Sequence, residues 1–166
     1  MAIKDSKTGK VWKDRNNLSW VDPTSQEVWD YNIAIAEDAL SRGFDEINFD
    51  YIRFPTDGDL EALSYPFYLG KTLKADEIEK FFAYLDEHLH KTPDVKISAD
   101  IFGLSIVDKD DLGIGQIMEN ALAHFDYINP MIYPSHYASG FIGYKNPASY
   151  PYEVVKYSLD YGMARL

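Results

Sequence analysis

The chain has 166 residues, of which 46% are hydrophobic and 15% aromatic, so it is long enough for one sizeable core and too short for two comfortable domains. Its formal charge of -11 would repel phosphate backbones and anionic lipid surfaces, which argues against nucleic acid as a partner. The lack of cysteine excludes disulfides and thiolate metal sites, and no apolar run approaches the roughly 20 residues of a membrane-spanning helix. We therefore predict one domain over residues 1–166, without a membrane span.

The first half of the chain alternates between extended and helical patterns. Residues 17–23 form a short extended segment that ends at Pro23. Helical spacing begins at Ser25 and stops at Gly43, a residue type that often follows the end of a helix. A strand rich in Ile, Phe and Tyr is predicted over residues 45–54.

The second half repeats this alternation. A helix is predicted over residues 74–90, and a strand over 94–103 follows it. The next helix is predicted from about Ile114, the next strand over 126–134, and a last helix over roughly 150–162. This order of strands and helices favours a parallel sheet with crossover helices.

The number of strands and helices predicts the fold class. With residues 18–21 included, the chain holds about four βα units, whereas a closed eight-stranded barrel needs about 250 residues. We therefore predict an α/β fold of the TIM-barrel type, present as a partial barrel with parallel strands. The alternative is an open, doubly wound sheet, but no G-x-G-x-x-G turn follows any strand, so a nucleotide site has no support and no cofactor is expected.

Polar side chains gather on one face of the predicted strands, because side chains alternate between faces along a strand. The residues expected on that face are Glu46, Asn48, Asp50, Ile52 and Phe54, then Lys96, Ser98 and Asp100, and finally Asn129, Met131 and Tyr133. A sheet covered by helices on both faces would be apolar on both. A barrel instead admits polar groups to its interior, so the pattern favours a barrel.

Three of these residues lie at the carboxyl ends of the predicted strands, where the active sites of barrels are found. They are Asp50, Asp100 and Tyr133. A structural interpretation exists for each carboxylate, since Asp50 could bond to Arg53 and Asp100 could cap a turn. The equivalent positions of the two carboxylates favour a shared functional site.

Three sequence blocks carry a resemblance to a known family. The segments "GFDEINFDYIRFP", "SADIFGL" and "DYINPMIYPSHY", in this order, resemble the uncharacterised glycosyl-hydrolase-like domain family, a TIM-barrel group distantly similar to α-amylase-type enzymes. The resemblance implies that Asp50 is the nucleophile and Asp100 the acid or base. The chain departs from the amylase-type pattern in one respect, because the acid there is usually the longer Glu.

Glycoside cleavage requires one carboxylate that attacks the sugar and one protonated carboxyl that donates to the leaving oxygen. Retention of configuration is expected at a separation of about 5 to 5.5 Å, and inversion at about 6.5 to 9.5 Å. Because adjacent strands lie about 4.8 Å apart, we predict that Asp50 and Asp100 form a retaining pair.

Four further residues are candidates for binding the substrate: Arg53, Asn129, Tyr133 and His136. The Tyr133 phenol could stack on a sugar, and Asn129 and His136 could hydrogen-bond its hydroxyl groups. Arg53 could fold over the end of its strand towards Asp50, or form an ion pair with the next helix.

Exposed aromatic side chains suit the apolar faces of sugar rings, although packing at the barrel rim is their commoner fate. The candidates for such a platform are Trp12, Trp20, Tyr65, Phe67 and Tyr68. A metal site built from Asp50, Asp100 and His136 is disfavoured, because no H-E-x-x-H or EF-hand spacing occurs, and we expect no metal.

The predicted function is thus hydrolysis of a poly- or oligosaccharide, with a carbohydrate as the partner. The alternatives are a sugar-binding or scaffold barrel without turnover, and a fragment that is inactive without the rest of the barrel. Exposed barrel edges favour self-association. The location stays open and includes a secreted or cell-envelope location for a longer parent protein, although the start "MAIKDSKTGK" lacks the apolar middle of a signal peptide.

Overall fold

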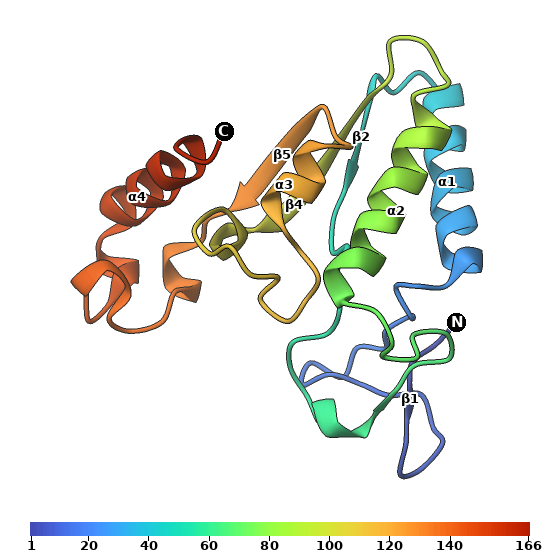
Figure 1. Cartoon of the computed structure of the whole chain (residues 1–166), viewed down its shortest axis with the longest axis horizontal. Coiled ribbons are helices and arrows are strands. Elements are labelled where there is room, and N and C mark those ends of the chain that lie inside the picture. The colour runs from blue at the N-terminus through green and yellow to red at the C-terminus, as the bar shows by residue number, and fades with distance from the viewer.

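A three-stranded parallel sheet forms the centre of the computed structural model, which describes all 166 residues (Figure 1). The strands lie in the order β2 (Glu46–Phe49), β4 (Lys96–Phe102) and β5 (Tyr127–Met131). A separate antiparallel pair joins β1 (Lys4–Asp5) to β3 (Leu63–Ser64). The fold is therefore mixed α/β with an open sheet, and the predicted parallel strands are confirmed.

Three helices cover one face of this sheet: α1 (Gln26–Ser41), α2 (Lys74–Leu89) and the short α3 (Met118–Leu122). Their apolar stripes and the inner strand residues form one core. Its members include Trp29, Ile33, Ile78, Phe82, Leu85, Phe49, Ile97, Ala99, Ile101, Met118 and Phe125. A fourth helix, α4 (Pro151–Met163), lies beyond β5 from α1 and α2 in Figure 1 and packs against the turn that follows β4. No helix has both the length and the apolar character to cross a bilayer.

The end of α1 shows how local sequence sets the helix boundaries. Gly43 adopts a φ of +93°, which only glycine reaches without strain. Its amide donates to the Leu40 carbonyl, and the Phe44 amide donates to the Ala39 carbonyl. This pair of bonds is a Schellman motif, so the predicted helix stop is confirmed.

The predicted strand over residues 45–54 is too long. It ends at Phe49, because Tyr51 has a φ of +59° and breaks the alternation of side chains. Ile52 and Phe54, which the alternation assigned to the polar face, are instead buried in the core.

Two other predictions differ from the structure. The sheet has three strands, because residues 18–21 form isolated antiparallel bridges with the N-terminal segment and join no parallel ladder. The helix predicted from Ile114 begins only at Met118. Gly113 and Gly115 both have positive φ angles, which keep that segment in turns.

The uncovered face of the sheet is polar up to the ends of its strands, as the alternation predicts. The Ser98 hydroxyl lies 2.6 Å from a Glu46 carboxylate oxygen and 3.0 Å from the Asn48 amide oxygen. The Asn129 amide donates to the same Asn48 oxygen at 3.3 Å. Hydrogen bonds thus link the polar side chains of all three strands.

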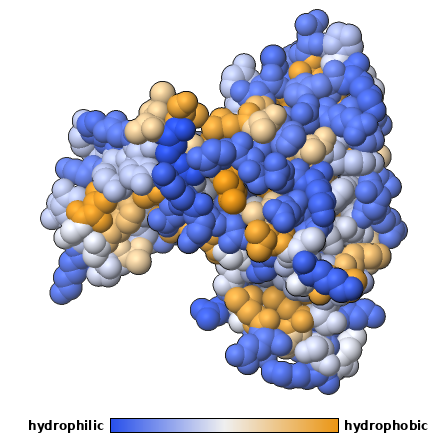
Figure 2. All heavy atoms as spheres, viewed as in Figure 1, coloured by the Kyte–Doolittle hydropathy of each residue, from blue (hydrophilic) through white to orange (hydrophobic).

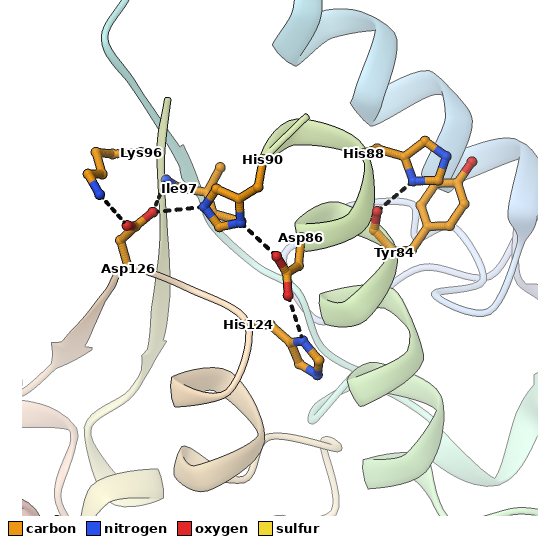
Figure 3. Close-up of polar contacts among 8 residues, drawn as sticks. All are labelled: Tyr84, Asp86, His88, His90, Lys96, Ile97, His124 and Asp126. Atoms are coloured by element: carbon orange, nitrogen blue, oxygen red, sulfur yellow. Dashed lines mark hydrogen bonds and ion pairs between the residues drawn. The ribbon is translucent and has the colours of Figure 1, made fainter. Parts of the chain in front are cut away.

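The amino-terminal end of the sheet carries a connected network of charged groups (Figure 3). Asp126 accepts from Lys96 at 2.7 Å and from the Ile97 amide at 3.0 Å. The two ring nitrogens of His90 lie 3.0 Å from Asp126 and 2.6 Å from Asp86. These contacts connect the end of α2 to the start of β4 and β5.

Candidate active site at the carboxyl ends of the strands

Three adjoining clefts line the carboxyl ends of the strands. We name them the Arg53 cleft, the Tyr133 cleft and the Asp100 cleft, with volumes of about 200, 190 and 410 Å³. Tyr51 lines both the Arg53 and the Tyr133 cleft, and Met131 and Tyr133 line both the Tyr133 and the Asp100 cleft. The three clefts therefore share walls. In the space-filling view, an indentation separates the C-terminal segment from the rest of the largely hydrophilic surface (Figure 2).

Asp50 is the first residue after β2 and is exposed to solvent. It lines the Arg53 cleft, and one of its carboxylate oxygens accepts the Tyr51 amide at 2.7 Å. Its other oxygen has no partner within the chain. The left-handed conformation of Tyr51 places the main chain in a turn directly beyond this carboxylate.

Asp100 lies within β4, is half-buried, and lines the Asp100 cleft with Asn129 and Tyr133. No hydrogen bond or ion pair within the chain engages its carboxylate. Val155 and Leu159 of α4 form the far wall of this cleft, so the cleft lies at the free edge of β5.

The strand register relates the two carboxylates. Phe49 and Ala99 form the last pair of the β2–β4 register, and Asp50 and Asp100 are the residues that directly follow them. The backbones at these positions are then about one strand spacing apart, ~4.8 Å. The side chains nevertheless line different clefts, with the Tyr133 cleft sharing walls with both.

Arg53 is only 9% exposed, and its guanidinium lies against three aromatic rings. The ring centroids of Trp20, Phe102 and Tyr51 are 4.7, 4.9 and 5.2 Å from its central carbon. Burial lowers the pKa of Arg53 below its ordinary value, and the nearby negative charges oppose this effect. The ion pair with the next helix that the sequence left open does not form.

The remaining predicted residues lie close to these groups. Tyr133 is 51% exposed, and its ring centroid is 5.1 Å from that of His136. Both residues line the Tyr133 cleft. Asn129 lies opposite Asp100 in the register of β4 and β5 and lines the Asp100 cleft.

Sequence reasoning missed several residues of the Tyr133 cleft. Tyr51, Phe102 and Tyr137 supply aromatic walls, and Gly103 lets the strands approach closely. A Cβ at Gly103 would lie 2.7 Å from both the Met131 carbonyl oxygen and the Tyr137 hydroxyl. The segment "IFG" after the polar strand positions was the available signal for this close approach.

The predicted aromatic platform is largely absent. Trp12 is buried in a small separate core with Ile3, and Tyr65 and Tyr68 pack edge-on against Phe54. Phe67 is exposed but lines a different cleft. Trp20 alone of these candidates reaches the site. No three His, Asp or Glu side chains converge in a way that could hold a metal ion.

Comparison with known proteins identifies one family. The family described as "Putative glycosyl hydrolase domain" matches residues 1–166. A crystal structure of a hypothetical protein from Ruminiclostridium thermocellum ATCC 27405 is similar, with 39% sequence identity and a TM-score of 0.50. That match covers 68% of this chain and 49% of the crystallised chain, so it spans about half the length of that protein. No curated protein matches the chain.

Proposed function

Because this chain belongs to the family described as "Putative glycosyl hydrolase domain", we propose that it hydrolyses O-glycosidic bonds of a poly- or oligosaccharide with two carboxylates. The observation that carries this proposal is that Asp50 and Asp100 directly follow Phe49 and Ala99, the last pair of β2 and β4, beside clefts with aromatic walls. Ligand pockets are lined mostly by apolar and aromatic side chains, with a few placed polar groups that fix the ligand.

We further propose that residues 1–166 form a single partial barrel of the TIM type, with a distant similarity to α-amylase-type barrels. The parallel order β2-β4-β5, with helices on one face and polar side chains on the other, supports this. The similar crystallised chain is about twice as long as the matched part, which leaves room there for further strands.

In the proposed reaction, Asp50 attacks the anomeric carbon while Asp100 gives its proton to the leaving oxygen. Asp100 then takes a proton from water, and the water oxygen replaces Asp50 on the sugar. Retention of configuration follows, because the sugar carbon is displaced twice. Tyr133 would stack on the sugar ring, and Asn129 and His136 would hydrogen-bond its hydroxyl groups.

A sugar-binding or scaffold domain without turnover is the alternative. One observation favours it, since the side chains of Asp50 and Asp100 line different clefts. A third proposal is that the chain needs the remaining strands of a longer parent before it acts. Self-association through the free edges of β2 and β5 stays a prediction, and a monomeric solution mass would contradict it.

The test is a screen of polysaccharides for release of reducing ends, followed by NMR of the first-formed anomer. Asp50→Asn and Asp100→Asn should each lower the hydrolysis rate by about 10³-fold or more, with saccharide binding retained. Wild-type binding without any turnover would support the scaffold alternative. An inverted first product would contradict the retaining mechanism.

Asp45→Asn is the matched control, because Asp45 lies before β2 at the opposite end of that strand. It should leave the rate unchanged. An equal loss of rate in this variant would assign the effect to general charge and remove the argument for Asp50.

A further inference from the structure

The buried guanidinium of Arg53 has unused hydrogen-bond donors. Nη1 donates to the Phe54 carbonyl at 3.1 Å and to the Thr56 hydroxyl at 3.3 Å. Nε is buried and has no partner. Nη2 donates to no group of the chain, and no carboxylate forms an ion pair with this side chain. A buried donor without a partner destabilises the fold, because it has lost its hydrogen bond to water, so this arrangement needs an explanation.

The two unused nitrogens lie on one edge of the guanidinium. The Nε–H bond and one Nη2–H bond are parallel in the planar group, and this edge matches the two oxygens of a carboxylate. The free donors of Arg53 therefore form a fork of the kind that binds a carboxylate with two bonds.

Arg165 shows what such a fork binds elsewhere in the same chain. Its side chain is 6% exposed, and its Nη1 also donates to main-chain carbonyls, those of Ser105 and Asp108. Its Nε and Nη2 donate to the two carboxylate oxygens of Glu119 at 3.0 and 2.7 Å. Arg53 likewise uses Nη1 within the chain, for one carbonyl and one hydroxyl, but no carboxylate of the chain meets its Nε and Nη2.

Each nearby carboxylate accepts at least one hydrogen bond from another group, and none contacts the fork of Arg53. Asp14 accepts the amides of Asn16 and Leu18 and the indole N–H of Trp20. Asp57 accepts the Arg15 amide, and Asp50 accepts the Tyr51 amide. They moderate the charge of Arg53 from a distance but leave its fork free.

We infer that the fork of Arg53 binds the carboxylate of an acidic sugar, so that the substrate class is a uronic-acid-containing saccharide. This inference rests on the proposed function for the identity of the ligand as a saccharide. Asp50 lines the same cleft, and Tyr51 lines both this cleft and the Tyr133 cleft. A uronate held by Arg53 would therefore lie beside the proposed nucleophile, with aromatic walls for its neighbouring sugar.

The test measures binding directly and needs no turnover. Trigalacturonate and a glucuronate-containing oligosaccharide are titrated into the chain, and the Arg53 Nε–H signal is followed by two-dimensional NMR. The fully methyl-esterified form of each sugar is the matched probe, because it keeps the ring and loses the anionic oxygens. We expect the acid to shift the Arg53 signal and to bind at least tenfold more tightly than the ester.

Arg53→Lys keeps the positive charge and removes the fork, so it should weaken acid binding about tenfold or more and leave ester binding unchanged. Arg42→Lys is the control, because its own fork is on the surface and already binds Asp38. The comparison of acid with ester uses the wild-type chain and holds even if Arg53→Lys fails to fold.

Three results would overturn the inference. Equal affinity for acid and ester would remove the carboxylate from recognition, and an equal response to inorganic sulfate would reduce the site to a general oxyanion site. If the Arg53 Nε–H signal of the sugar-free wild type already had the downfield position of a carboxylate-bound fork, and lost it in Asp50→Asn, Asp50 itself would fill the fork. Binding of the acid without any hydrolysis would contradict the proposed function and leave this inference standing. Hydrolysis of neutral sugars alone would support the proposed function and contradict this inference.

Discussion

The two ends of the parallel sheet both carry charged side chains, but only the amino-terminal end satisfies them. There Asp126 has three donors, and both ring nitrogens of His90 face carboxylates. At the carboxyl end, Asp100 has no partner and Arg53 keeps a free fork. Charges whose partners lie within the chain hold the fold together, and charges without them are available to a ligand.

The hydrogen bonds at the amino-terminal end also shift the pKa values of its charged groups. Hydrogen bonds from Lys96, the Ile97 amide and His90 hold the pKa of Asp126 well below its usual range, against the opposing effect of burial. The Asp86 and Asp126 carboxylates raise the pKa of His90. Asp86 and Asp126 therefore keep their charge to a lower pH, and His90 keeps its proton to a higher pH, than the same groups would in the unfolded chain.

The largest expected contrast is in stability between matched variants at the two ends. Asp126→Ala should lower the free energy of unfolding by about 2 kcal/mol, because it removes three bonds, two of them charged, at a partly exposed site. Asp100→Ala removes no bond and should change stability by less than about 0.5 kcal/mol. Urea unfolding of both variants measures this difference. Equal losses in the free energy of unfolding would show that the two ends of the sheet do not differ in this way.

Gly103→Ala tests the packing behind the carboxyl end. Its Cβ would meet the Met131 carbonyl oxygen at 2.7 Å, so β5 must shift, at a cost of about 1–2 kcal/mol. Saccharide binding at the Tyr133 cleft should weaken as well, because Gly103 lines it. A calorimetric melt and a binding titration measure the two effects. A variant with wild-type binding would show that this close approach does not shape the cleft.

The smallest effect is the pH dependence of the amino-terminal network. The raised pKa of His90 contributes stability that is present below about pH 6.5 and is lost as pH rises through the folded-state pKa. The lowered pKa values of Asp86 and Asp126 contribute stability that is lost as pH falls below about 4. Thermal melts between pH 2 and 9 should show a maximum on the acidic side of neutrality.

His90→Gln should remove the loss of stability above pH 6.5 and keep the loss at low pH. His136→Gln, at the carboxyl end, serves as the control and should show the same loss of stability at high and at low pH as the wild type. If His136→Gln instead removed the loss of stability above pH 6.5, the assignment of that loss to His90 would be wrong.

The sequence predicts the regular elements better than the details of the site. The stripe containing Ile78, Phe82 and Leu85 has the period of a helix, and α2 follows it closely. The end of β2 could not be predicted, because it depends on the left-handed backbone of one residue, Tyr51. Tyrosine rarely adopts that conformation, so the sequence does not indicate it. Gly113 and Gly115 were visible in the sequence and could have excluded a helix from Ile114.

The candidate site was predicted in part for the same physical reason. The alternation of polar residues predicts Asp50, Asp100 and Asn129 on one face of neighbouring strands, and the register pairs Asp100 with Asn129 and ends one pair before Asp50. The free fork of Arg53 could not be predicted. It depends on Trp20 and Phe102, which come from distant parts of the chain to cover the guanidinium.

The most direct test of the account is to trap the sugar on the proposed nucleophile. The chain is incubated with 2-deoxy-2-fluoro glycosyl fluorides of neutral and uronic acid sugars, which slow the second displacement, and the peptides are analysed by mass spectrometry. The account predicts a covalent sugar on Asp50, formed by the wild type and by the control Asp45→Asn but absent in Asp50→Asn. A sugar attached to any other residue, or turnover of a true substrate that Asp50→Asn leaves intact, would contradict it.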